Sequence, residues 1–264
     1  MKILLFWFGY QGKKYYTYLK NKYWFSFDII TKSGKVDVLV KQDDKVYKYN
    51  EEEIIRKLSK YDVIIVAVSP LSEQEKILNM LLKVNINAKV LVEKPVVEDL
   101  KYLKDLVYRK NFYFFCDEIV NWKYIKDIFD KYNKSNTFVF QKKIFFIPNL
   151  EYHIFEHAIC NFLYLNKTWL ENLLNDLSLK SEPFNKFLLW RKIFYKIIVG
   201  NLIFINLGGR LLIKAGNNYW IKKINFYEAV DFYLFKLTDK DNFIFKNNYF
   251  VFRAFIDKYK VIKI

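Results

Sequence analysis

Four short apolar segments dominate the first hundred residues; each ends in a turn, and three stretches with helical periodicity lie between them. These segments are Lys2–Phe8, Trp24–Thr31, Asp62–Val68 and Lys89–Val92. Continuous apolar runs of this length are typical of strands buried on both faces of a parallel sheet. The stretches expected to be helical are residues 13–22, 51–60 and 72–84, and residues 36–40 are expected to form a short extended piece. Repeated β-α units of this kind predict an α/β fold with a doubly wound parallel sheet, whose ligands bind beyond the carboxyl ends of the strands.

The pattern changes after about residue 120. Helices are expected over residues 122–132, 150–165, 227–237 and 249–259, and strands over residues 137–147, 197–215 and 219–226, with Gly208-Gly209 as a turn. Strands in series with helices on one side predict an α+β domain with an open, mainly antiparallel sheet. We therefore expect two domains, residues 1–120 and 121–264, with a last helix that could pack back on the first domain.

Composition excludes several classes of protein. With 53% hydrophobic and 20% aromatic residues, the 264-residue chain can bury a large core, which excludes a disordered chain. No apolar run reaches the roughly 18 uncharged residues of a membrane helix, and the apolar start is too short for a signal peptide. Two cysteines, Cys116 and Cys160, do not make a disulfide framework. We expect a soluble, cytoplasmic protein with no membrane partner.

The net charge of +16 invites a nucleic-acid interpretation. Against it, only five of the 44 basic residues are arginine, which forms bidentate hydrogen bonds to phosphates and base edges better than lysine does. No stretch gathers five or six basic residues, and the abundance of Lys, Asn and Ile fits A/T-rich codons. We expect solvated surface lysines and no nucleic-acid partner; a site for a nucleotide or sugar phosphate is the alternative use of the charge.

The turn after the first predicted strand contains Trp7-Phe8-Gly9-Tyr10-Gln11-Gly12. A dinucleotide-binding fold places its pyrophosphate at such a strand-turn-helix, where glycines allow a tight turn and close approach of the backbone amides. The second and third glycines of that fingerprint are present as Gly9 and Gly12, and Trp7 replaces the first. An ordinary two-glycine turn is the alternative. We predict that Gly9, Tyr10, Gln11 and Gly12 bind a cofactor.

The second predicted strand ends in Ile29-Ile30-Thr31-Lys32-Ser33-Gly34-Lys35. Dinucleotide folds usually carry an acid here for the adenosine ribose, and this stretch has none. The hydroxyl and ammonium groups of Thr31, Lys32 and Ser33 would suit a 2′-phosphate, which favours NADP slightly over NAD. A solvated Lys/Ser loop is the alternative.

The third and fourth predicted strands end in the sharpest motifs, Ser69-Pro70 and Glu93-Lys94-Pro95. The pair, separated by a helix, resembles the glucose-fructose oxidoreductase/inositol dehydrogenase/MocA family of NAD(P)-dependent oxidoreductases. The resemblance implies a Rossmann-like dinucleotide-binding domain over residues 1–120, with Ser69, Pro70, Glu93, Lys94 and Pro95 at the cofactor. It implies that Lys94 lies near the nicotinamide and substrate, and that Pro95 follows a cis peptide bond.

The same family carries an Asp and a His four residues apart on the first helix of its second domain, with an acid three residues further on. The matching residues here are His153, His157 and Cys160, which include the only two histidines of the chain. By resemblance His157 falls on the family's catalytic His, while His153 replaces the Asp and Cys160 the later acid. Residues at i, i+4 and i+7 share a helix face, so a zinc site and two histidines capping a core helix are the alternatives. We expect no metal.

The resemblance implies hydride transfer between a nicotinamide and a carbohydrate-like alcohol or ketone, such as a sugar or nucleotide sugar. Histidine suits the accompanying proton transfer, so His157 is the expected general base, Lys94 the donor to the reacting oxygen and His153 an orienting group. The alternative is a non-catalytic descendant that binds a nucleotide or a protein partner. The second domain is expected to bind substrate and to form a homodimer or larger homo-oligomer through aromatic strands such as Phe138-Val139-Phe140 and Phe145-Phe146.

Overall fold

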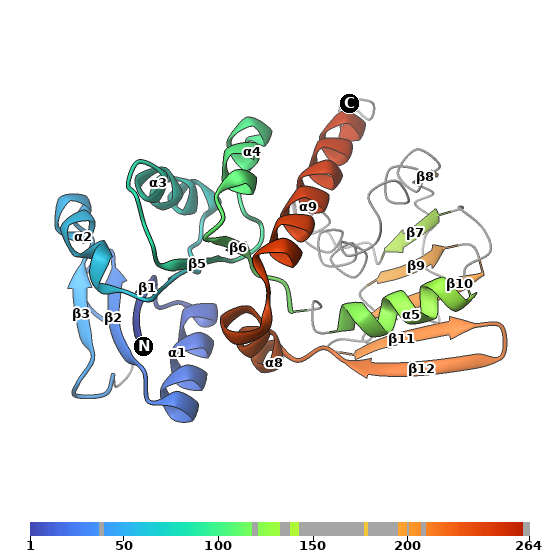
Figure 1. Ribbon diagram of the computed structural model, residues 1–264, viewed down its shortest axis with the longest axis horizontal. Helices are drawn as coiled ribbons and strands as arrows, with labels where there is room; N and C mark the ends of the chain where they lie inside the picture. The colour runs from blue at the N-terminus through green and yellow to red at the C-terminus, as the bar shows by residue number, and fades with distance from the viewer. Residues whose placement is uncertain are drawn as a thin grey trace. The chain divides into compact units, whose positions relative to one another are not determined.

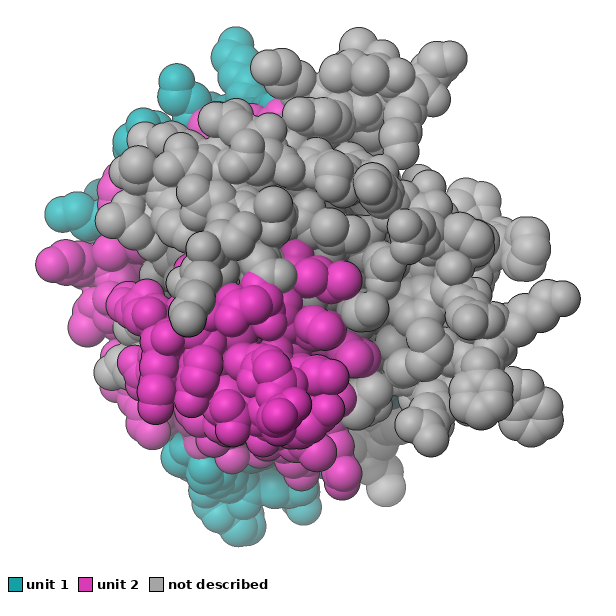
Figure 2. All heavy atoms as spheres, turned by 90° about the vertical axis from the view of Figure 1, so that its right-hand side faces the viewer, with its two compact units in different colours: residues 1–115 teal, residues 116–264 magenta. Residues whose placement is uncertain are grey.

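The computed structural model describes residues 1–36, 40–117, 121–132, 138–142, 177–178, 195–199, 201–206 and 210–260. The chain divides into two compact units, residues 1–115 and 116–264, which Figure 2 draws in different colours.

The first unit is built on a six-stranded sheet in the order β3-β2-β1-β4-β5-β6, in which every neighbouring pair is parallel. The strands are β1 (Lys2–Phe6), β2 (Ser26–Thr31), β3 (Lys45–Lys48), β4 (Val63–Val66), β5 (Lys89–Val92) and β6 (Phe112–Phe114). This is the strand order of the Rossmann fold, in which the direction of winding reverses between β1 and β4. The predicted doubly wound parallel sheet is confirmed.

Helices cover both faces of this sheet (Figure 1). Helix α1 (Tyr10–Tyr23) lies on one face, and α2 (Glu51–Lys57), α3 (Leu71–Leu82) and α4 (Leu100–Tyr108) lie on the other. The inner strands are therefore apolar on both sides, and all four residues of β4 are buried. This double covering explains why the sequence shows continuous apolar runs instead of alternation.

The edge strand β3 was not predicted. The sequence placed a short extended piece at residues 36–40, but Val36 and Val40 are not in a strand, and residues 37–39 lie outside the described part. No residue of β3 is fully buried. An exposed strand does not need a continuous apolar run, so its sequence carries no strand signal. The loop before it is anchored by the Asp44 carboxylate, which accepts hydrogen bonds from Tyr16 Oη (2.9 Å), Lys20 Nζ (2.9 Å) and the Phe27 N–H (2.8 Å).

The second unit contains a sheet in the order β12-β11-β10-β9-β7-β8. Its strands are β7 (Phe138–Lys142), β8 (Leu177–Ser178), β9 (Tyr195–Val199), β10 (Leu202–Asn206), β11 (Arg210–Ala215) and β12 (Asn218–Lys223). All pairs are antiparallel except β7 with β8. This confirms the open, mainly antiparallel sheet.

One face of the second sheet is covered by α5 (Trp122–Tyr132), the helix predicted over the same residues. The ring of Tyr132 lies 5.2 Å from that of Trp220, and Lys222 Nζ lies 4.0 Å from the centre of the Tyr124 ring. After β12 the chain forms α8 (Phe226–Asp231), the π-helical turn η4 (Phe232–Lys236) and the long helix α9 (Asp239–Lys260). None of the described helices is long and apolar enough to cross a membrane.

The strand expected over residues 219–226 ends at Lys223, and two other predicted elements of this unit differ more in their bounds. The strand expected over residues 197–215 is three strands, because the chain also turns at Asn201 between β9 and β10. The helix expected from residue 249 begins ten residues earlier, where Thr238 Oγ1 accepts the Asp241 N–H (3.1 Å) and donates to the Asp241 carboxylate (2.8 Å). The Thr238 side chain thus caps the start of α9. The predicted helix 150–165, the Gly208-Gly209 turn, and Phe145 and Phe146 lie outside the described residues.

Candidate functional site

The predicted cofactor turn lies between β1 and α1. Gly9 is the N-cap of α1, has no side chain that could cap the helix, and is followed by a first turn without an acidic residue. The backbone N–H groups at the start of this 14-residue helix therefore form an end that carries the partial positive charge of the helix dipole. An anion such as a pyrophosphate suits this position.

The two glycines of the turn are required for different reasons. A Cβ atom at Gly12 would lie 2.2 Å from the carbonyl oxygen of Trp7, so Gly12 lets α1 pack closely against the end of β1. A Cβ at Gly9 would meet nothing within 4 Å, and Gly9 has an ordinary φ of −72°. The fold does not need a glycine at position 9. The open space over Gly9 fits a group that must approach the backbone closely, as a dinucleotide pyrophosphate does.

Trp7 makes the tight turn where the fingerprint has its first glycine. Its φ of +65° lies in the left-handed region that bulky side chains avoid. The Trp7 N–H donates to the carbonyl of Ile30 at the end of β2 (2.9 Å), and its ring packs edge-on against Tyr49 with centroids 5.9 Å apart. The replacement of glycine by tryptophan therefore preserves the turn and adds an aromatic surface beside it.

The residues expected at the adenosine end lie in the loop after β2. Thr31 Oγ1 donates to the Lys35 carbonyl (3.1 Å), and Ser33 Oγ accepts the Lys35 N–H (3.2 Å), so both hydroxyls shape the loop. Lys32 Nζ forms an ion pair with Glu73 Oε1 of α3 at 3.5 Å. Glu73 was missed by the sequence analysis, since it follows β4 and not β2 and only the fold brings it to this loop.

Ser69-Pro70 and Glu93-Lys94-Pro95 follow β4 and β5, as predicted. Both the Ser69–Pro70 and Lys94–Pro95 peptide bonds are cis, in agreement with the expectation for Pro95. Pro70 is the N-cap of α3, and its carbonyl accepts the Glu73 N–H (3.0 Å). Since β4 and β5 are adjacent and parallel, both turns lie at the same edge of the sheet as the Gly9 turn.

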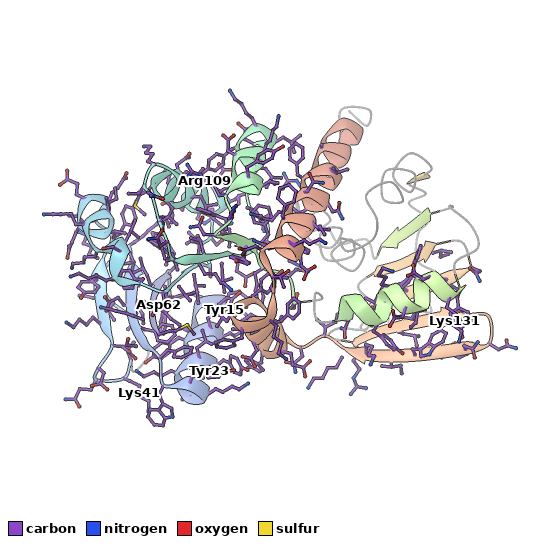
Figure 3. The ribbon with its side chains drawn as sticks, viewed as in Figure 1. Tyr15, Tyr23, Lys41, Asp62, Arg109 and Lys131 are labelled. Atoms are coloured by element: carbon purple, nitrogen blue, oxygen red, sulfur yellow. The ribbon has the colours of Figure 1, made fainter. Side chains whose placement is uncertain are left out.

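The Lys94 turn is held from both faces of the sheet. Tyr15 of α1, labelled in Figure 3, donates its hydroxyl to Glu93 Oε1 (2.7 Å). Gln74 of α3 is buried, and its Nε2 lies 3.0, 2.7 and 3.0 Å from the carbonyl oxygens of Glu93, Pro95 and Val96. These contacts fix the backbone on each side of Lys94.

Gln74 and Tyr15 were not identified from the sequence. Gln74 did carry a signal, because it stands on the helix face that also contains Ile77 and Leu78, which are buried. A polar side chain on a buried face requires hydrogen-bond partners. The sequence could not show that these partners are the carbonyls of the Lys94 turn.

The predicted second-domain residues His153, His157 and Cys160 lie outside the described residues. Their roles, and the zinc alternative, therefore stay predictions. Within the part of the chain that the structure describes, no group of three or more His, Cys, Asp or Glu side chains could hold a metal ion.

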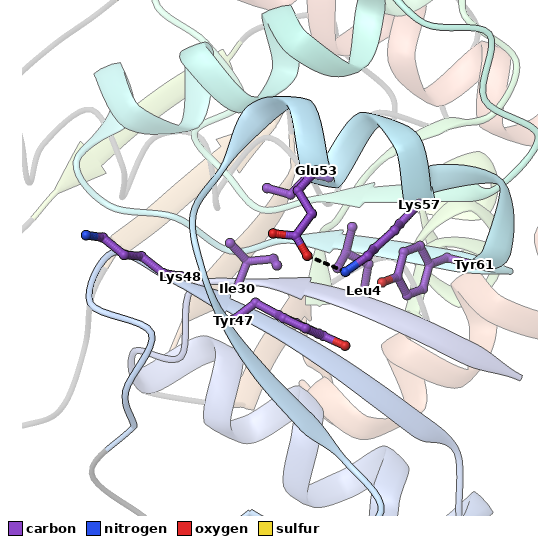
Figure 4. A pocket seen from close by; sticks show the side chains of 8 residues that line it. Leu4, Ile30, Tyr47, Lys48, Glu53, Lys57 and Tyr61 are labelled. Carbon is purple, nitrogen blue, oxygen red and sulfur yellow. Dashed lines mark hydrogen bonds and ion pairs between the residues drawn. The ribbon is translucent and has the colours of Figure 1, made fainter.

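A separate small pocket lies beneath α2 and contains none of the predicted site residues (Figure 4). Its lining includes Tyr47, Tyr61 and the Glu53–Lys57 ion pair. The pKa of Tyr61 is raised above its ordinary value, first by burial and then by its hydrogen bond to Asp28 (2.6 Å). This pocket is part of the packing of α2 on the sheet.

No protein-family model matches the chain, and no curated protein matches it. Solved structures do match in fold. UDP-N-acetylglucosamine 3-dehydrogenase GnnA from Acidithiobacillus ferrooxidans has a TM-score of 0.58 at 10% identity, covering 96% of this chain and 95% of that chain. The WlbA (WbpB) dehydrogenase from Thermus thermophilus, in complex with NAD and UDP-GlcNAcA, has a TM-score of 0.54 at 11% identity, covering 96% and 94%.

Biliverdin reductase from Synechocystis sp. PCC 6803, in complex with biliverdin and NADP+, has a TM-score of 0.56 at 12% identity, covering 96% of this chain and 98% of that chain. These structures include both NAD- and NADP-bound proteins. At such identities the likeness shows a shared fold, over nearly the whole length of each chain.

Proposed function

We propose that this protein is an NAD(P)-dependent oxidoreductase that transfers hydride between a nicotinamide and a CH–OH carbon of a small carbohydrate-like molecule. The observation that carries the proposal is the open space over Gly9, a glycine that the fold does not need, at the uncapped start of α1. Support also comes from the shared fold with dehydrogenases whose names include a nucleotide sugar. A sugar or nucleotide sugar is the substrate class we favour.

The chain's own residues would hold the cofactor along the carboxyl edge of the first sheet. The first-turn amides of α1 and the space over Gly9 would take the pyrophosphate. The loop at residues 31–35 would take the adenosine end, where the sequence slightly favours NADP. Ser69-Pro70 and Glu93-Lys94-Pro95 would line the nicotinamide side. When bound, the cofactor supplies or accepts the hydride.

The protein's part in the reaction is to orient the substrate and to move a proton. The Lys94 ammonium would donate a hydrogen bond to the reacting oxygen, from a turn that Gln74 and Tyr15 hold in place. His157 would take the proton of an alcohol during oxidation and return it during reduction. His153 would contact or orient the substrate where the resembling family has an Asp.

The test begins with titration of the purified protein with NADH and NADPH, followed by cofactor fluorescence, and then with a panel of polyols and nucleotide sugars for turnover. His157→Ala should lower turnover by about 10²–10⁴-fold and leave cofactor affinity nearly unchanged. Lys94→Ala should lower both. Full activity of His157→Ala would refute the proton-transfer role, and a folded protein that binds neither cofactor would refute the proposal as a whole.

Two observations favour a second candidate, a descendant that binds a nucleotide without turnover. Trp7 occupies the first glycine position in a left-handed conformation, and His153 stands where the family's Asp is expected. Cofactor binding without turnover of any substrate in the panel, unchanged by His153→Asp, would support this candidate over the enzyme.

A further inference from the structure

Four side chains gather near the carboxyl end of β2 in the first sheet. They form two pairs, the aromatic pair Trp7–Tyr49 and the ion pair Lys32–Glu73. The Trp7 N–H is bonded to Ile30 O and the Tyr49 N–H to Thr31 O, each at 2.9 Å, which places both residues at the carboxyl end of β2. The aromatic pair therefore lies beside the loop that carries Lys32.

The ion pair spans the switch point of the sheet. Lys32 follows β2, and Glu73 lies in the first turn of α3, which follows β4; β1 stands between these two strands. The distance from Lys32 Nζ to Glu73 Oε1 is 3.5 Å. The charge of Glu73 also helps raise the pKa of Tyr49, after burial and Glu51. Glu73 thus stands near the end of β2, where dinucleotide folds commonly place an acid for the ribose.

The two charges of the pair differ in how firmly they are held. Glu73 also accepts a hydrogen bond from Lys76 of its own helix (3.2 Å), and Lys76 and Lys32 together hold its pKa below the usual range, so it is anionic at neutral pH. The side chain of Glu73 is 24% exposed and that of Lys32 is 58% exposed. Lys32 is therefore the partner that can turn toward a ligand, while Glu73 stays in place.

We propose that the Lys32–Glu73 pair sets the choice between NAD and NADP, with its two residues acting in opposite directions. This inference rests on the proposed function. The Glu73 carboxylate can accept a hydrogen bond from a ribose 2′-hydroxyl and repels a 2′-phosphate. Lys32 can leave Glu73 to pair with that phosphate, so Glu73 competes with the phosphate for Lys32. A bound 2′-hydroxyl leaves the ion pair intact.

The experiment measures the dissociation constants of NADH and NADPH for the full chain and two variants, by cofactor fluorescence. The quantity compared is the ratio of the NADH constant to the NADPH constant. Glu73→Gln should raise this ratio about tenfold, because the phosphate no longer meets the carboxylate and Lys32 is released. Lys32→Gln should lower it about tenfold, since one charge-assisted hydrogen bond to the phosphate is lost.

The matched controls are Glu53→Gln and Lys57→Gln, which make the same charge changes in the ion pair of α2, beneath which the pocket of Figure 4 lies. Both controls should leave the ratio within about twofold of the original protein. Ratios that stay within twofold in Glu73→Gln and Lys32→Gln as well would overturn this inference and leave the proposed function standing. A folded protein that binds neither NADH nor NADPH would overturn both.

Discussion

At the scale of single residues, the two glycines of the turn after β1 differ in role: the fold requires one of them, and the other leaves space for a ligand. Gly12 is required because a Cβ atom at this position would lie too close to the backbone of Trp7. Gly9 has neither a close neighbour nor a positive φ, so its lack of a side chain matters only for what approaches from outside. Trp7 carries the left-handed conformation that glycine would adopt with less strain.

We predict that Gly9→Ala and Gly12→Ala separate binding from stability. Gly12→Ala gains up to about 1 kcal/mol of helix propensity, but the 2.2 Å approach to a backbone oxygen cannot be relieved by a rotamer change. We expect a net loss of about 2 kcal/mol in the free energy of unfolding. Gly9→Ala should lose less than about 1 kcal/mol, the difference between glycine and alanine at an N-cap, yet weaken NAD(P)H binding tenfold or more.

Urea denaturation and cofactor titration of both variants would check this. Equal destabilisation by the two substitutions would show that Gly9 is a structural glycine. If Gly9→Ala bound the cofactor as tightly as the original protein, the pyrophosphate could not bind at this turn as proposed.

The site residues that could be predicted are those whose signal is local. Gly9 and Gly12 follow a strand run directly, and Lys94 stands in a tripeptide at the end of another. Glu73 and Gln74 could not be predicted, because each acts on a segment about twenty or more residues away in sequence. The partner of Gln74 is the Lys94 turn and that of Glu73 is Lys32. Their roles depend on the order of the strands, which no short pattern contains.

At the scale of elements, strands covered on both faces were predicted well and exposed ones were not. The apolar runs that became β1, β4 and β5 exist because helices cover both sides of the sheet. Strand β3 has the exposed sequence Lys45-Val46-Tyr47-Lys48 and gives no such signal. In the second unit, β9 and β10 were merged because the residues at the turn between them interrupt the apolar pattern only briefly. Exposed strands and brief turns inside apolar runs are therefore the two sources of error here.

We predict that β3 depends on Asp44. The Asp44 side chain is fully buried, with 0% exposure, and it ties α1 and β2 to the loop that leads into β3. Asp44→Ala would leave the Lys20 ammonium, itself only 7% exposed, without this carboxylate. Removing one member of a buried ion pair costs about 3 kcal/mol or more. We expect that loss in the free energy of unfolding, measured by urea denaturation.

The adjacent Asp43 is exposed and provides the control. Asp43→Ala should change the free energy of unfolding by less than about 0.5 kcal/mol. Similar values for the two variants would mean that the network around Asp44 does not anchor the strand.

At the scale of the whole molecule, the sequence predicted the two kinds of sheet from a change in pattern near residue 120. The first sheet has the order of the Rossmann fold, and the second is open and mainly antiparallel. Dehydrogenases with 10–11% identity to this chain share this fold over nearly its whole length. A pattern of buried and turn positions survives replacement of most individual residues. The side chains that choose a substrate do not follow from such a pattern.

The second sheet has two different faces. Leu211, Ile213 and Ala215 of β11 are buried on the face that α5 covers, together with Leu202 and Phe204 of β10. On the opposite face the register brings together apolar side chains that are partly or largely exposed: Ile203, Ile205, Leu212, Tyr219 and Ile221. Tyr219 and Ile221 of the edge strand β12 are 59% and 61% exposed. The same register places the basic residues Arg210, Lys214 and Lys223 on this face, and Lys214 Nζ lies 5.2 Å from the centre of the Tyr219 ring. Exposed apolar side chains gathered on one sheet face are typical of interaction surfaces.

We predict that this face joins two copies of the chain, as the sequence analysis expected for the second domain. The side chains of Phe138, Val139 and Phe140, and residues Phe145 and Phe146, lie outside the described part of the chain. The predicted interface is instead the face of β10, β11 and β12 that carries the exposed apolar side chains.

Light scattering at micromolar concentration should give the mass of a dimer or of a larger assembly. The double variant Tyr219→Glu, Ile221→Glu should give the monomer, because it buries two carboxylates against an apolar surface. Tyr108→Glu, at an exposed aromatic residue of the first unit, is the control and should leave the assembly intact. A monomeric original protein, or a double variant that still assembles, would show that this face remains open in solution.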